Sequence, residues 1–133
     1  MANAITRKSR PKYLSLPALL FEIRLPLAGW VSILHRISGL LLFVAMLWLL
    51  SMLERSLTSE AGFVAVRHFA GLGIVKLPLL VLIWAYCHHF CAGIRFLFLD
   101  LDMGVDLGKA RLTSFAVLVL SLALTVWLGL KLW

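Results

Sequence analysis

Three long apolar runs constrain the fold of this chain more than any other feature. They extend from Ile37 to Leu53, from Leu77 to Arg95 and from Leu112 to Leu130. Each is near the ~20 residues that an α-helix needs to cross a hydrocarbon core of ~30 Å. Only 14% of the residues are charged, against about a quarter in soluble domains. The sequence therefore predicts an all-α integral membrane protein with three transmembrane helices.

The chain is expected to form one membrane-anchor domain over residues 1–133. Prolines and a glycine interrupt residues 1–29, which predicts an amphipathic cytoplasmic lead-in and no continuous helix. The spans are expected at about 30–53, 76–99 and 113–131. The loop after the first span has room for a short surface helix before Gly71, and a short acidic turn precedes the third span.

The basic residues indicate the orientation of the chain in the membrane. Of the 13 Lys and Arg residues, four lie beyond the outer ends of the spans: Arg55, Arg67, Lys76 and Lys131. The other nine lie in the lead-in, at the start of the first span, or around the second turn. This bias places the N-terminus inside and the C-terminus outside. Because the basic residues flank apolar spans and do not alternate with aromatic residues, nucleic acid is not an expected partner.

A polar cluster opens the first span. Ser32, His35, Arg36 and Gly39 follow helical spacing and share one helix face. A guanidinium and a hydroxyl one turn apart can bind a carbonyl or carboxylate ligand. In the alternative interpretation, Arg36 extends to the lipid headgroups and Ser32 bonds to its own helix. Because His35 accompanies them inside an apolar segment, we favour a binding site.

A second cluster lies late in the second span, at the same expected depth. His88 and His89 are adjacent, and Gly93 follows His89 by one turn, as Gly39 follows His35. Imidazole is a common iron ligand, and glycine would let a flat macrocycle approach the helix. Packing against another helix explains the same glycines equally well. His88 is interpreted as the more ordinary histidine, which hydrogen-bonds across a helix interface.

Other catalytic and metal-binding motifs are missing. Cys87 and Cys91 do not form the C-x-x-C-H motif of covalent haem attachment, and both fall among apolar residues. The aspartates of the acidic turn are spaced superficially like a calcium loop, but the glycine and the terminal glutamate at the required offsets are missing. No phosphate-binding loop or nucleophile elbow occurs. We therefore do not expect the chain to catalyse a reaction without other subunits.

Two motifs resemble those of a known family. They are S-x-x-H-R-x-S-G from Ser32 to Gly39 and H-x-x-x-G-I-R from His89 to Arg95, preceded by an Arg-Pro pair at Arg10. Together they resemble the large cytochrome b anchor subunit of succinate dehydrogenase, respiratory complex II. The resemblance implies a bacterial inner-membrane subunit that pairs with a second three-helix anchor subunit. It also implies a flavoprotein subunit and an iron–sulfur subunit as partners.

The same resemblance implies cofactors and residue roles. One haem b would be shared with the second anchor subunit, and ubiquinone would be the substrate that is reduced. His89 would be the axial haem ligand, His35 and Arg36 would lie near the haem propionates, and Ser32 and Arg36 would bind quinone. In much of the family a histidine follows Gly-Ile-Arg. Phe96 stands there in this chain, so no propionate or proton-relay contact is carried over to that position.

Two other functions fit the same residues. One is a cofactor-free membrane adaptor in which the histidines and Arg36 make only interhelical hydrogen bonds. The other is the anchor of a related quinol:fumarate reductase that works with menaquinone. A b-type absorption band distinguishes the first from a cytochrome, whereas donor side chains alone do not determine which quinone is used.

Overall fold

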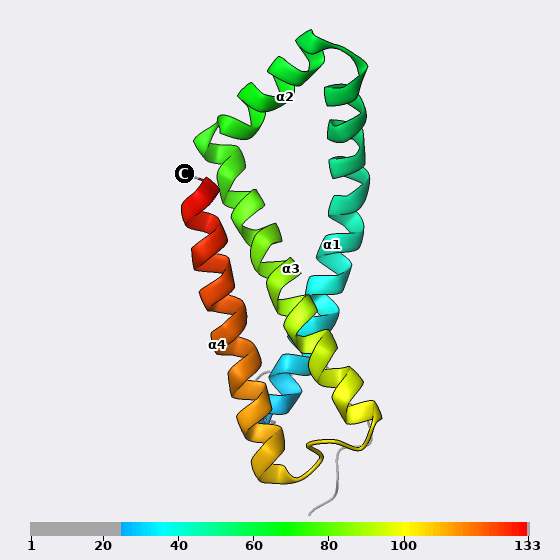
Figure 1. The fold of residues 1–133 in the computed structure, drawn as a ribbon, viewed down its shortest axis with the longest axis vertical. Coiled ribbons are helices and arrows are strands. Elements are labelled where there is room, and N and C mark those ends of the chain that lie inside the picture. The colour runs from blue at the N-terminus through cyan, green and yellow to red at the C-terminus, as the bar shows by residue number, and fades with distance from the viewer. Residues whose placement is uncertain (1–24, 133) are drawn as a thin grey trace, which may run out of the picture.

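The computed structural model describes residues 25–132, and within them the chain forms four helices (Figure 1). They are α1 (Leu27–Thr58), α2 (Glu60–Gly71), α3 (Gly73–Asp100) and α4 (Leu107–Leu132). By length and composition, α1, α3 and α4 can each cross a membrane. The all-α fold with three candidate spans is therefore confirmed. The lead-in predicted over residues 1–29 lies almost entirely outside the described residues.

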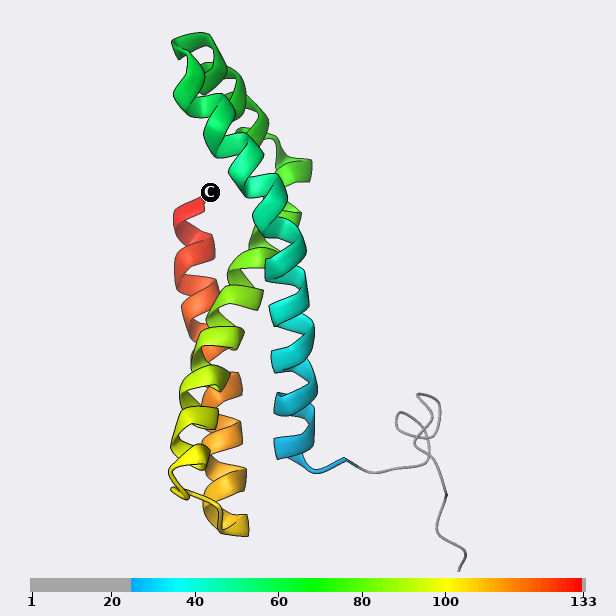
Figure 2. The same cartoon turned by 90° about the vertical axis from the view of Figure 1, so that its right-hand side faces the viewer.

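The long helix α3 packs against both α1 and α4. Figures 1 and 2 show that the start of α1 and the turn between α3 and α4 lie at the same end of the bundle, while α2 bridges α1 and α3 at the other end. The helices extend beyond the apolar runs at several ends, with α4 beginning at Leu107. This arrangement brings the polar start of α1 beside the second half of α3.

A serine separates α1 from the short helix α2. Ser59 has an extended backbone, with φ −162° and ψ 158°, and its hydroxyl accepts a hydrogen bond of 3.0 Å from the Gly62 amide. This is the geometry of a helix N-cap. The backbone therefore turns at Ser59, and the short helix expected before Gly71 is confirmed.

Small residues line the contact between α3 and α4. The buried positions of α4 are Ser114, Val117, Ser121, Thr125 and Gly129. Small side chains let two membrane helices approach closely. A Cβ atom at Gly129 would lie only 2.8 Å from Leu80 Cδ1. The buried hydroxyls donate hydrogen bonds to carbonyls of their own helix, for example Ser114 to Ala110 at 2.6 Å. Each buried hydroxyl of α4 therefore has a hydrogen-bond partner.

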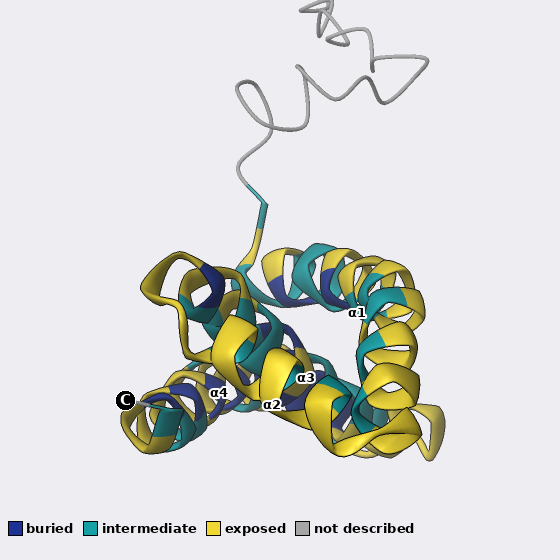
Figure 3. Cartoon of the chain, turned by 90° about the horizontal axis from the view of Figure 1, so that it is seen from above, coloured by how far each residue is buried: buried dark blue, intermediate teal, exposed yellow. Residues whose placement is uncertain are grey.

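The outer faces of the long helices remain apolar and exposed. Figure 3 shows exposed residues on all of them, with buried residues limited to the inner contacts. On α1 only Val31 and Ser38 are buried, while Leu40 is 65% exposed and Phe43 is 64% exposed. In water such faces would be unfavourable, but lipid tails or other membrane helices satisfy them.

Candidate functional site

The two histidine clusters predicted at a common depth meet where α1 crosses α3. The rings of His35 and His89 stack with their centroids 4.2 Å apart and their planes within 11° of parallel. Both side chains are half-buried, which leaves part of the pair accessible from outside the chain. Two imidazole side chains, one from α1 and one from α3, therefore lie in direct contact.

The glycines that follow the two histidines face the opposite helix. A Cβ atom on Gly39 would lie 2.9 Å from His89 Cε1, closer than van der Waals contact permits, whereas one on Gly93 would lie 3.7 Å from His35 Nε2. The spacing allowed these glycines either to admit a flat macrocycle or to let two helices pack closely. In the structure they lie in the contact between α1 and α3. The observed position of the His89 ring requires a glycine at position 39, whereas position 93 has room for a Cβ atom.

The hydrogen bonds of His89 determine which of its ring nitrogens carries the proton. Nδ1 lies 3.1 Å from the His35 carbonyl oxygen and 3.3 Å from Ser38 Oγ. The Ser38 hydroxyl itself donates to the same carbonyl at 2.9 Å. Because a carbonyl oxygen only accepts, Nδ1 carries the hydrogen and donates it, and Nε2 keeps a free lone pair. This is the tautomer that ligates a metal through Nε2.

Ser38 is a site residue that the helical pattern did not single out. It is fully buried and lies one turn after His35, off the face that Ser32 and Arg36 share. Its position in the S-x-x-H-R-x-S-G motif was the only available signal, and that motif alone assigns it no role. Its contact with His89 depends on how α3 is rotated against α1.

Phe96 occupies the space beside His35. Its ring centroid lies 5.0 Å from that of His35, with the planes tilted by 48°. An aromatic ring in this place supports the imidazole by packing and offers it no proton donor or acceptor.

Ser32 and Arg36 lie on α1 but outside the contact between the histidines. Ser32 is half-buried and Arg36 is exposed. Neither forms a hydrogen bond or an ion pair with another residue of the described range 25–132. Their donors are therefore unused within the described part of the chain.

His88 differs from His89 in its surroundings. Its side chain is fully buried, its ring stacks on Trp84 at 5.5 Å, and within residues 25–132 neither ring nitrogen has a hydrogen-bond partner. The backbone of Val31 on α1 faces this ring across the helix interface, as expected for His88, although their geometry is not that of an ordinary hydrogen bond. The chain itself encloses this imidazole, so a large group cannot reach it.

The remaining metal-ligating side chains do not converge. Cys87 and Cys91 are buried, form no disulfide with each other and pack as small core residues. Over the described part of the chain, no group of three or more His, Cys, Asp or Glu side chains could bind a metal ion. A single imidazole can still serve iron whose other ligands come from a porphyrin and a second protein chain.

Comparisons with known proteins identify the family. Residues 6–128 match the sequence profile of the succinate dehydrogenase/fumarate reductase transmembrane subunit. The succinate dehydrogenase cytochrome b556 subunit of Rickettsia felis is 33% identical over 79% of this chain and 82% of its own length. The subunits of the same name are 30% identical in Coxiella burnetii, over 86% and 92%, and 33% identical in Paracoccus denitrificans, over 77% and 79%. The chain belongs to the succinate dehydrogenase/fumarate reductase transmembrane subunit family, as a succinate dehydrogenase cytochrome b membrane subunit.

Proposed function

We propose that this chain and a second three-helix anchor subunit bind one haem b between them and form part of the site that reduces ubiquinone. Electrons would reach this site from the flavoprotein through the iron–sulfur subunit. The observation that carries the proposal is the His89 imidazole, whose Nδ1 donates to a carbonyl of α1 and whose Nε2 is free on a half-buried face. The proposed place of the complex is the bacterial inner membrane.

The residues around His89 suit an axial haem ligand. The hydrogen bond from Nδ1 to the His35 carbonyl orients the ring and increases the basicity of Nε2. His89 would hold the iron from this side, and the second anchor subunit would supply the opposite ligand. A bound haem b supplies a one-electron carrier. His35, whose ring stacks on that of His89, and the adjacent, exposed Arg36 would donate to the propionates.

Ser32 and Arg36 suit the binding of a quinone. One turn of α1 separates them, and neither donor is used within the described chain. A hydroxyl and a guanidinium can both donate to a quinone carbonyl oxygen, whose negative charge grows during reduction. Arg36 would contribute more than Ser32, because hydrogen bonds from charged donors are stronger than those from neutral ones.

The exposed apolar surface supports the proposed assembly. Little of α1 is buried within this chain, although its polar start carries the proposed site residues. A site on the surface of one subunit becomes enclosed only when a second subunit covers it. The second anchor subunit would cover this face of α1 and α3, and lipid would surround the rest.

The absorption spectrum of the purified complex tests the haem proposal. After reduction with dithionite we expect a b-type band in the complex that contains this chain. If that complex assembles and shows no such band, the chain is a cofactor-free adaptor.

The quinone proposal is tested by two activities in the same membranes. Ser32→Ala and Arg36→Gln should lower succinate:ubiquinone reductase activity while leaving dye reduction by the soluble subunits unchanged. The loss should be larger for Arg36→Gln, since a charge-assisted bond is worth ~1.5–3 kcal/mol and a neutral one ~1 kcal/mol. An unchanged ratio of the two activities in both variants would place the quinone site elsewhere.

A further inference from the structure

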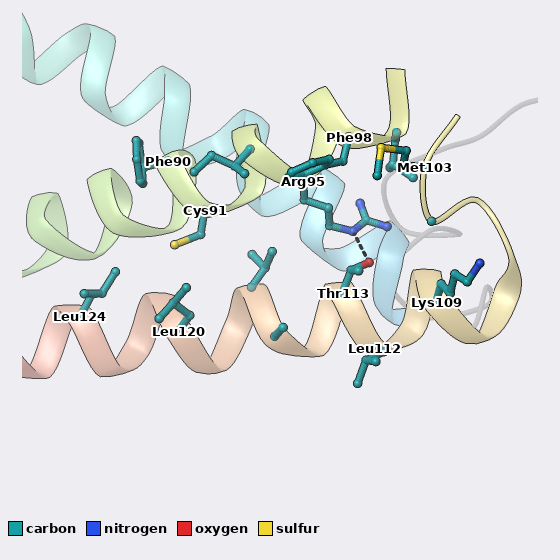
Figure 4. A pocket seen from close by; sticks show the side chains of 15 residues that line it. Phe90, Cys91, Arg95, Phe98, Met103, Lys109, Leu112, Thr113, Leu120 and Leu124 are labelled. Atoms are coloured by element: carbon teal, nitrogen blue, oxygen red, sulfur yellow. Dashed lines mark hydrogen bonds between the residues drawn. The ribbon is translucent and has the colours of Figure 1, made fainter. Parts of the chain in front are cut away.

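An apolar groove runs along the contact between α3 and α4. Its volume is about 480 Å³. Figure 4 shows Cys91, Leu120 and Leu124 toward one end and Met103 and Lys109 toward the other. The groove has an apolar body and a basic end.

Arg95 is the polar side chain buried in this groove. Only 7% of the residue is exposed. Its Nε donates to Thr113 Oγ1 at 3.1 Å, and within residues 25–132 no carboxylate pairs with its charge. The terminal nitrogens of the guanidinium thus keep their donors. In Figure 4 they point toward the end of the groove that carries Lys109.

The charges that line the groove have one sign. Among the described residues that line the groove, Arg95 and Lys109 are the only basic side chains and none is acidic. Asp106 forms a 3.0 Å ion pair with Lys109, but both side chains are about 70% exposed, so this pair is worth little. Asp100 and Asp102 are exposed and do not line the groove. The Arg95 guanidinium lies over the Phe96 ring, 5.5 Å from its centroid, so within residues 25–132 its charge has an aromatic partner but no acidic one.

The dimensions of the groove match one leaflet of a bilayer. Leu112 and Leu124, both lining residues, are separated on α4 by about 18 Å at 1.5 Å per residue, and half of a ~30 Å hydrocarbon core is about 15 Å. Arg95 lies five residues before the end of α3, about 7.5 Å below it along the helix axis. A guanidinium at that depth can meet a headgroup phosphate.

We propose that this groove binds one anionic phospholipid, with its phosphate on Arg95 and Lys109 and one acyl chain along the apolar body. A planar guanidinium with free donors fits two phosphate oxygens. A zwitterionic lipid would leave the charge of Arg95 only partly compensated. An arginine that merely extends to the interface would be largely exposed, whereas only 7% of Arg95 is exposed and it lines the groove. None of the proposed haem and quinone residues lines the groove, although Phe96, which contacts Arg95, also packs against His35.

Native mass spectrometry of the whole purified complex tests the proposal. The complex is reconstituted in nanodiscs of phosphatidylglycerol and phosphatidylcholine in equal amounts, then released and weighed. We expect one retained phosphatidylglycerol per copy of this chain. Millimolar inorganic phosphate should not displace it, because the acyl chain also contributes to binding.

Two pairs of variants locate the lipid. Ala116→Phe fills the groove, while Val119→Phe adds the same ring to an exposed position of α4 outside it. Arg95→Gln removes the buried charge, while Arg111→Gln removes an exposed one outside the lining. Retention should fall about tenfold or more in the first member of each pair and stay unchanged in the second. If Arg95→Gln does not assemble, the phenylalanine pair decides.

Three results would overturn the proposal. They are equal retention of phosphatidylglycerol in both phenylalanine variants, equal retention of phosphatidylcholine in the unmodified complex, and a structure of the complex in which a segment of another subunit fills the groove. The haem band and the dye reductase activity of Ala116→Phe should be normal. Failure of the lipid proposal is thereby separated from failure of the cytochrome proposal.

Discussion

At the scale of single residues, Gly39 has less freedom than Gly93. An added Cβ would lie 2.9 Å from His89 Cε1, against 3.7 Å from His35 Nε2 for the same change at Gly93. The helical spacing paired each glycine with the histidine on its own helix. In the structure each glycine faces the histidine of the opposite helix. This depends on how α1 is rotated against α3, which spacing along one helix cannot predict.

Replacing the two glycines by alanine should have unequal effects. Gly39→Ala forces the His89 ring away from its place and is expected to lower the haem content or broaden the reduced band. Gly93→Ala should leave both near normal, because its Cβ meets only ordinary van der Waals contact. Haem is quantified per purified complex by absorption. Equal effects of the two changes would show that the crossing of α1 and α3 differs from the one described.

At the scale of elements, the sequence predicted the apolar spans well and the helix ends less well. Hydropathy reports where lipid replaces water, and it located all three long helices. The ends depend on local backbone partners. The cap at Ser59 ends the extension of α1, and Leu72, with φ −66° and ψ 131°, separates α2 from α3.

The turn between α1 and α2 should be sensitive to one of the two glycines in α2. A Cβ on Gly62 would collide with the carbonyl oxygen of Arg55, whereas nothing lies within 4 Å of one on Gly71. Gly62→Ala is therefore expected to open this turn and to speed amide hydrogen exchange around Ser59. In Gly71→Ala, the amides around Ser59 should exchange hydrogen at the same rate as in the unmodified protein. Unchanged exchange in Gly62→Ala would contradict the described turn.

At the scale of the whole molecule, the common depth of the two histidine clusters follows from topology. Two antiparallel spans with polar residues at the start of one and the end of the next must place them at one end of the bundle, and the 4.2 Å ring stacking confirms it. The burial of Arg95 against Thr113 was not predicted, since it requires the contact between α3 and α4.

The orientation in the membrane is a further prediction at this scale. The excess of basic residues near the start of α1 and the turn between α3 and α4 places both inside. Reporter fusions test it: a periplasmic reporter should be active at the C-terminus and inactive at the N-terminus. The reverse pattern would put the proposed site on the side opposite the soluble subunits.

The central claim is that this chain holds the haem iron through His89, and the reduced absorption spectrum of two matched variants tests it most directly. His89→Leu removes the imidazole whose Nε2 is free, and His88→Leu removes its enclosed neighbour, which has no hydrogen-bond partner in the described chain. In assembled complexes with normal dye reductase activity, the b-type band should be lost or strongly shifted in His89→Leu and retained in His88→Leu. A band that survives His89→Leu and disappears in His88→Leu would contradict the account.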